Sequence, residues 1–128
     1  MTGSDDPRSS GVRLIIVEDD PLIASVVRDM ALRLGHEVAG IASGSTHWLM
    51  TNTRCDVAVL DVRLGREANF NSAEDAVTRG CGIVFATGFP EDIPGHLQKW
   101  PILIKPFSEK ELGEAIGRAL ATRQGSRA

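Results

Sequence analysis

The chain has few of the residues that build disulfide frameworks or zinc sites. Its two cysteines, Cys55 and Cys81, are far apart in the sequence, and each borders a predicted strand. Its three histidines, His36, His47 and His96, do not have the spacing of metal ligands. These counts exclude a disulfide framework and a zinc site, so we expect two free buried thiols in a reducing cytosol.

The chain also lacks an excess of positive charge. It has 14 Lys and Arg against 17 Asp and Glu, which gives a formal net charge of −3. Proteins that bind nucleic acid or anionic membrane surfaces through their charge have the opposite balance. We therefore expect neither nucleic acid nor a membrane among the partners.

An apolar segment is missing from the N-terminus as well. The first ten residues are rich in Gly, Ser, Asp and Pro and lack the apolar core of a secretory signal. We expect a disordered tail over residues 1–10, one domain over residues 11–123, a C-terminal tail over residues 124–128 and a cytoplasmic location.

Four short apolar runs are present, and each is followed by polar residues. Strands that are apolar along their whole length are typical of parallel sheets covered on both faces, and such sheets bind ligands beyond the carboxyl ends of their strands. A weaker strand is predicted over residues 37–42. The four runs and the residues that follow them are Leu14-Ile15-Ile16-Val17 before Glu18-Asp19-Asp20, Val57-Ala58-Val59-Leu60 before Asp61, Ile83-Val84-Phe85-Ala86 before Thr87, and Ile102-Leu103-Ile104 before Lys105-Pro106.

Helical patterns alternate with these strands. A short amphipathic stretch covers residues 46–53, and the Pro- and Gly-rich segment 88–95 leaves room only for a short helix near residues 95–99. This alternation predicts an α/β fold, a doubly wound five-stranded parallel sheet with helices on both faces. The other predicted helices, with their capping signals, run from Asp20-Pro21 to Gly35, from Ser72 (with Asp75) to Arg79, and from Ser108 (with Glu111) to about residue 121.

Parallel strands would bring the polar residues together at one edge of the sheet. Like charges about 4 Å apart repel by roughly 4 kcal/mol at an effective dielectric constant of about 20, so Glu18, Asp19 and Asp61 need a cation besides Lys105. Mg²⁺ prefers such oxygen ligands. A carboxylate that lies beside Mg²⁺, an ammonium group and the Thr87 hydroxyl is well placed to attack phosphorus and form an aspartyl phosphate. Asp61 is the candidate nucleophile because it is the single acid at the end of its strand.

The strings that contain these residues resemble the receiver domain of bacterial two-component response regulators. The resemblance covers nearly the whole chain and implies the flavodoxin-like strand order 2-1-3-4-5. Residues 85–89, Phe-Ala-Thr-Gly-Phe, further resemble a subgroup of single-domain receivers whose signature reads Phe-Ala-Thr-Gly-Tyr. The four matching strings are Val17-Glu18-Asp19-Asp20, Leu60-Asp61, Ala86-Thr87-Gly88 and Lys105-Pro106-Phe107.

The resemblance assigns roles to the acids. It implies that Asp61 accepts a phosphoryl group from a histidine kinase or a histidine phosphotransfer protein. Asp19, Asp61 and the backbone carbonyl of Arg63 would bind Mg²⁺ directly, with Glu18 acting through water. Asp20 is left out of the site, because capping the helix that follows explains it.

The resemblance also assigns roles to the basic and hydroxyl groups. Lys105 would contact Asp61 and, after phosphorylation, the phosphoryl group, and its peptide bond to Pro106 would be cis. Thr87 would act as a switch hydroxyl. Many receivers carry an aromatic residue three positions before this lysine, whereas this chain has Ile102 there.

A partner surface is expected in the segment that follows Thr87. Phosphorylation would reorder residues 88–102 and change a surface for an unknown downstream protein, formed by Phe89, Leu97, Trp100 and Ile102. A partly buried core position is an equal alternative for Trp100. Because only a short tail follows the last helix, we expect output through binding alone, and no catalysis beyond the chain's own phosphorylation and dephosphorylation.

Two other functions are compatible with the same residues. Phosphohydrolases that form an aspartyl phosphate usually need a second acid two positions after the nucleophile, but this chain has Arg63 there. A receiver fold could also serve as an interaction module that never cycles phosphate, although every expected ligand position is filled.

Overall fold

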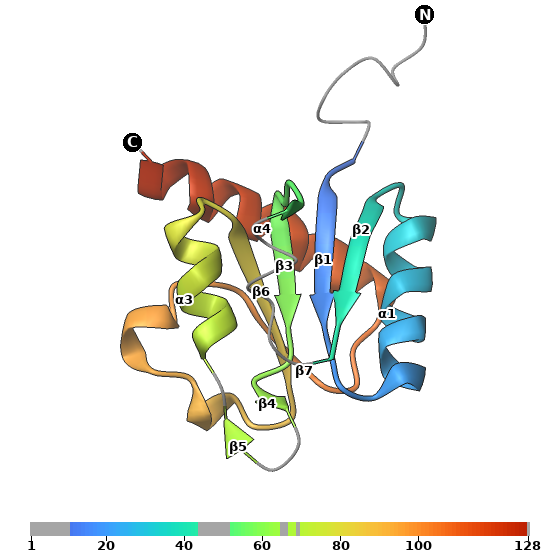
Figure 1. The fold of residues 1–128 in the computed structure, drawn as a ribbon, viewed down its shortest axis with the longest axis horizontal. Coiled ribbons are helices and arrows are strands. Elements are labelled where there is room, and N and C mark those ends of the chain that lie inside the picture. Colours follow the sequence, from blue (N-terminus) through green and yellow to red (C-terminus); the bar gives the residue numbers. More distant parts are fainter. Residues whose placement is uncertain (1–10, 44–51, 65–66, 69, 128) are drawn as a thin grey trace, which may run out of the picture.

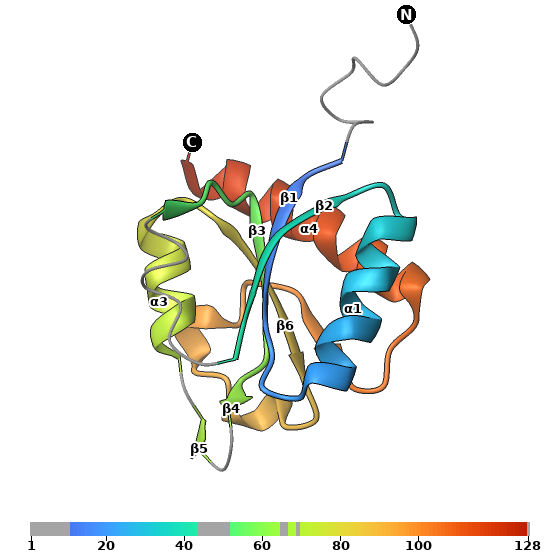
Figure 2. The ribbon, with the colours of Figure 1, turned by 45° about the vertical axis from the view of Figure 1, so that its right-hand side comes forward.

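The computed structural model describes residues 11–43, 52–64, 67–68 and 70–127. Within these ranges, a central sheet is flanked by helices on both sides (Figures 1 and 2). The expected tail at residues 1–10 lies outside the described residues, as does most of the expected helix at residues 46–53.

The central sheet contains five parallel strands in the order β2-β1-β3-β6-β7. In five-strand numbering this order is 2-1-3-4-5, so the predicted fold class and strand order are confirmed. Parallel pairing places the carboxyl ends of all five strands at one edge. The strands are β1 (Arg13–Val17), β2 (Glu37–Ala42), β3 (Val57–Leu60), β6 (Gly82–Thr87) and β7 (Ile102–Ile104).

In the described part of the chain, helices cover both faces of the sheet. Helix α3 (Asn71–Thr78) lies on one face, whereas α1 (Pro21–Arg33) and α4 (Glu109–Arg127) lie on the other (Figure 2). Alternate residues of the strands therefore join two cores: Ile15 packs on the α3 side and Leu14 on the α1 and α4 side. Among the described residues, no helix has the length and apolarity needed to cross a membrane.

Two predicted helix starts are confirmed by their caps. The Asp20 side chain accepts hydrogen bonds from the backbone N–H groups of Leu22 and Ile23, at 2.9 and 3.3 Å. Ser108 and Glu111 form a reciprocal capping box, with hydrogen bonds of 2.9 and 3.1 Å. These local signals fix where α1 and α4 begin.

Other helix boundaries differ from those predicted. Ser72 does not cap α3: the helix starts at Asn71 after Phe70, and Ser72 is buried inside its first turn. Helix α4 continues to Arg127, so residues 124–127 extend a helix and do not form a separate tail. The sequence after residue 121 contains no proline that would have ended it.

The segment after β6 contains two short 3₁₀ helices, η2 (Pro90–Asp92) and η3 (Gly95–Leu97), in place of a long helix. Phe89 is 45% exposed, but Leu97 and Trp100 are only 2% and 3% exposed. They pack with Ile93 in the core on the α3 side, and Ile102 packs partly buried against the same core. The prediction that Leu97 and Trp100 lie on the partner surface is therefore wrong. With no full helix here, these side chains fill the space over the sheet.

The sequence analysis missed a small hairpin after β3. Strand β4 (Arg63–Leu64) pairs antiparallel with β5 (Glu67–Ala68). Each of its strands is only two residues long, too short for a recognisable strand pattern in the sequence. The hairpin begins close to Asp61 and projects from the carboxyl edge of the sheet (Figure 1).

Gly82 allows β6 and α4 to pack closely. A Cβ atom at this position would lie 2.9 Å from the backbone oxygen of Ala119. Gly82→Ala should lower the free energy of unfolding by about 1–3 kcal/mol, because backbone has to move. Gly117→Ala is the control: it is exposed on α4 with open space around it and should raise stability by about 0.5–1 kcal/mol. Urea unfolding tests both, and equal effects would contradict this packing.

Candidate functional site

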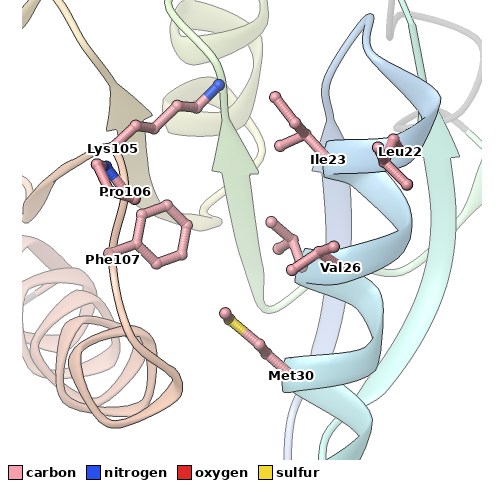
Figure 3. Close-up of a pocket in the computed structure, with 8 residues that line it drawn as sticks. Leu22, Ile23, Val26, Met30, Lys105, Pro106 and Phe107 are labelled. Carbon is pink, nitrogen blue, oxygen red and sulfur yellow. The ribbon is translucent and has the colours of Figure 1, made fainter.

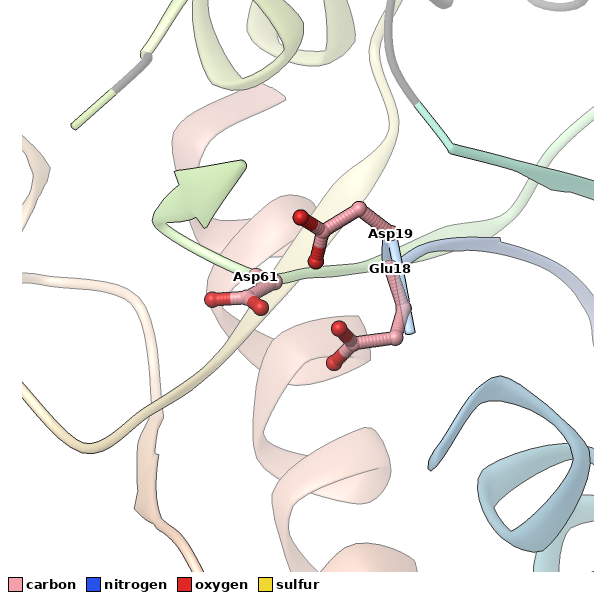
Figure 4. Close-up of side chains that lie close together, drawn as sticks. All are labelled: Glu18, Asp19 and Asp61. Carbon is pink, nitrogen blue, oxygen red and sulfur yellow. The ribbon is translucent and has the colours of Figure 1, made fainter. Parts of the chain in front are cut away.

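Three carboxylates lie together at the carboxyl edge of the sheet. Glu18 and Asp19 follow β1, and Asp61 follows the neighbouring strand β3. Backbone hydrogen bonds extend the ladder past the strands, from Asp61 N–H to the Val17 carbonyl at 2.9 Å and from Glu18 N–H to the Ala42 carbonyl at 2.9 Å. One oxygen from each acid lies within 4.8 Å of the others, and the side chains converge (Figure 4).

Lys105 supplies the positive charge between two of these acids. Its Nζ lies 2.7 Å from Glu18 Oε1 and 3.1 Å from Asp61 Oδ2. The residue follows β7, and its backbone N–H donates to the Thr87 carbonyl at 2.9 Å. The Lys105-Pro106 peptide bond is cis, as predicted. The structure thus brings Glu18, Asp61 and Lys105 into direct contact.

Burial and hydrogen bonding shift the pKa values of two groups. Glu18 is only 6% exposed, and this burial raises its pKa. The hydrogen bonds from Lys105 and from the Asp20 backbone N–H act in the opposite direction, but the pKa remains raised. For Lys105, burial favours a lower pKa, but the hydrogen bonds to Glu18 and Asp61 outweigh it and raise the pKa. Lys105 is therefore held as a cation, whereas an additional positive charge would favour the ionised form of Glu18.

Thr87 ends β6 and is fully buried. Its hydroxyl oxygen accepts a hydrogen bond of 2.8 Å from the backbone N–H of Phe89. The side chain thus fixes the start of the segment that leads into η2. The switch role of Thr87 stays a prediction.

The donor set fits a hard divalent cation. Three carboxylates offer oxygen ligands within the span of one ion, and such ligands are those that Mg²⁺ prefers. Asp20 is not part of this set, because its side chain caps α1. Arg63 begins β4 shortly after Asp61, and the proposed role of its backbone carbonyl stays a prediction.

An apolar groove adjoins this cluster. It has a volume of about 460 Å³ and lies between α1 and the segment that joins β7 to α4 (Figure 3). Two apolar residues of α1, Leu22 and Val26, are 73% and 45% exposed there. The sequence predicted this helix but not that some of its apolar side chains stay uncovered. The groove is lined by Leu22, Ile23, Val26, Val27, Met30, Lys105, Pro106 and Phe107.

Comparisons with known proteins agree on one family. No family model matches the chain. It is 31% identical to the phyllosphere-induced regulator PhyR of Methylorubrum extorquens, in an alignment that covers 89% of this chain and 45% of PhyR. The chain spans about half the length of the curated relatives it matches.

Two solved structures cover the same fold along most of their own length. SdrG from Sphingomonas melonis shares 32% identity and a TM-score of 0.75, covering 88% of this chain and 98% of SdrG. The REC (receiver) domain of the response regulator PhyR from Erythrobacter litoralis shares 25% identity and a TM-score of 0.75, covering 88% of this chain and 92% of that domain. The chain is a response-regulator receiver domain.

The charge balance of this receiver predicts opposite effects of two substitutions in the absence of divalent cations. Lys105→Met should lower the free energy of unfolding by about 1–3 kcal/mol, because it leaves the buried Glu18 without its cationic partner. Asp61→Asn should raise it by about 1 kcal/mol, because it removes one of three clustered negative charges. Urea unfolding with a metal chelator measures both changes, and a loss of stability in both variants would contradict the proposed balance.

Proposed function

We propose that this receiver is a phosphoacceptor in a cytoplasmic two-component or phosphorelay pathway. Asp61 would take a phosphoryl group from a histidine kinase or a histidine phosphotransfer protein, and the modified receiver would act by binding another protein. The observation that carries the proposal is the contact of Lys105 with both Glu18 and Asp61 at the sheet edge. The contact supports the proposal because a cation beside the Asp61 carboxylate would stabilise added negative charge there.

The proposed transfer requires little from the side chains beyond position and charge. An Asp61 oxygen would form the new bond to phosphorus while the bond from phosphorus to the donor imidazole nitrogen breaks, and the imidazole leaves. No general base is needed, because the attacking carboxylate is already an anion. Mg²⁺, when bound by Asp19 and Asp61 and through water by Glu18, would offset negative charge on the phosphoryl oxygens. Lys105 would stay near Asp61 and contact the added group.

A change at Thr87 would carry the signal to the surface. Its hydroxyl oxygen now accepts from the Phe89 backbone N–H at 2.8 Å. If the hydroxyl turns to donate to a phosphoryl oxygen, that hydrogen bond weakens and the segment around the half-exposed Phe89 is released. We propose this segment as the changed surface, with Leu97 and Trp100 acting from the core beneath it.

Labelling with acetyl phosphate and Mg²⁺ tests the phosphoacceptor. Intact mass should show one phosphoryl group on the wild-type chain and none on Asp61→Asn. Asp20→Asn is the matched control, because asparagine keeps the helix cap and we place no phosphoryl or metal contact on Asp20. A label that persists in Asp61→Asn would refute the acceptor assignment, and steady turnover of phosphate esters would favour a phosphohydrolase.

The apolar groove beside Lys105 supports a docking site for the phosphodonor. One end of the groove is formed by Lys105, whose ammonium contacts Asp61, and its side is formed by the exposed Leu22 and Val26. We propose that a helix of the donor packs its apolar face in this groove. Its phosphorylated histidine would then reach the Asp61 carboxylate, so docking and chemistry would use adjoining surfaces.

Leu22→Asp tests this docking site. A charge in the groove should slow phosphotransfer from a phosphohistidine protein that labels the wild type by at least about tenfold, which corresponds to about 1.4 kcal/mol. Labelling by acetyl phosphate should not change, because the small donor needs no groove. Leu32→Asp is the control, since Leu32 is also exposed on α1 but does not line the groove. Equal slowing of phosphotransfer by both variants would argue against docking of the donor in the groove.

A further inference from the structure

The two cysteines lie near each other at the sheet edge opposite the carboxylates. Cys55 comes shortly before β3 and Cys81 immediately before β6, and these two strands pair in parallel. Parallel pairing therefore brings together thiols that are distant in the sequence. Cys81 is 4% exposed, and Cys55 is partly buried against the same core.

A direct contact joins the two residues. The Cys81 thiol donates a hydrogen bond to the Cys55 carbonyl oxygen, with a sulfur to oxygen distance of 3.1 Å. Neither cysteine is in a disulfide in the structure. The Cys81 sulfur thus lies against the Cys55 backbone in a folded chain that has no other cysteine.

The surroundings make the two thiols chemically different. The pKa of Cys81 is lowered, chiefly by the neighbouring Cys55 thiol, although burial acts in the opposite direction. The positive charges of Arg123 and Arg79 also lower this pKa, whereas the negative charge of Asp56 raises it. The neighbouring Cys81 thiol and burial raise the pKa of Cys55. Arg123 is held nearby by its hydrogen bond of 3.1 Å to the Asp56 carbonyl. Cys81 is the better nucleophile, and Cys55 remains a protonated neighbour.

We propose that Cys55 and Cys81 form a site of reversible oxidation by hydroperoxides, separate from the phosphoacceptor. The Cys81 thiolate attacks a peroxide oxygen and becomes a sulfenic acid while the O–O bond breaks. The Cys55 sulfur then attacks the Cys81 sulfur, and water leaves with the Cys55 proton. In sum, two thiols and one hydrogen peroxide give one disulfide and two waters, and a dithiol reverses the change.

The resulting disulfide would close a loop that contains the phosphoacceptor. The segment between Cys55 and Cys81 includes β3, Asp61 and α3, and its two ends already lie side by side. Linking them would restrict the unfolded chain and so stabilise the element that holds Asp61. Oxidation should therefore shift the thermal unfolding midpoint of the wild-type chain upward.

Peroxide titration of the native receiver tests the proposal. The wild-type chain should lose both thiols together, remain a monomeric chain on a non-reducing gel, and regain both thiols with dithiothreitol. The proposal would be overturned if both thiols persisted at peroxide concentrations that consume free N-acetylcysteine. It would also be overturned if the only disulfides formed were between different chains. This measurement needs no substitution, so it does not depend on the folding of a variant.

Single variants assign the roles. With Cys55→Ser, the Cys81 sulfenic acid should accumulate and react with dimedone, whereas Cys81→Ser should leave Cys55 at least about tenfold less reactive. Equal dimedone labelling of both variants would overturn the assignment of Cys81 as the nucleophile. Labelling of Asp61 by acetyl phosphate is expected in both variants, so failure of the thiol site and failure of the phosphoacceptor proposal would be distinguishable.

Discussion

The contact of the Lys105 ammonium with Glu18 and Asp61 is the interaction on which the site depends. Glu18 is buried at the end of β1, where a carboxylate without a partner would be costly. One ammonium, at 2.7 and 3.1 Å, serves both carboxylates, which leaves the cluster with net negative charge. That remaining charge is why the cluster suits a divalent cation and, through it, an incoming phosphoryl group.

The parallel sheet explains why functional groups gather at its two edges. At the carboxyl edge, the last residue of β6 provides a hydroxyl, and the residues after β1, β3 and β7 provide acids and an ammonium. At the opposite edge, the residues before β3 and β6 place the Cys81 thiol in contact with the Cys55 backbone. The proposed phosphorylation and oxidation sites flank the same strand β3, which follows Cys55 and precedes Asp61.

Much of the site was predictable because it follows local rules. Fully apolar strands indicated a covered parallel sheet, and the polar residues after them had to meet at one edge, where the structure places Glu18, Asp19, Asp61 and Lys105. Features that depend on tertiary packing were not predictable. Trp100 stands beside Pro101 with no apolar periodicity, yet it fills the core beneath the short 3₁₀ helices. Likewise, tertiary packing decides which apolar side chains of α1 are covered and which stay exposed.

The most direct test of the central claim is a crystal structure with Mg²⁺ and beryllofluoride, which mimics a phosphoryl group on a carboxylate. Our account predicts beryllofluoride bonded to an Asp61 oxygen, Mg²⁺ held by Asp19 and Asp61, Lys105 in contact with a fluorine, and the Thr87 hydroxyl turned away from the Phe89 N–H. If Asp61 bound no beryllofluoride while Lys105 kept its present contacts, the claim that this carboxylate receives a phosphoryl group would be contradicted.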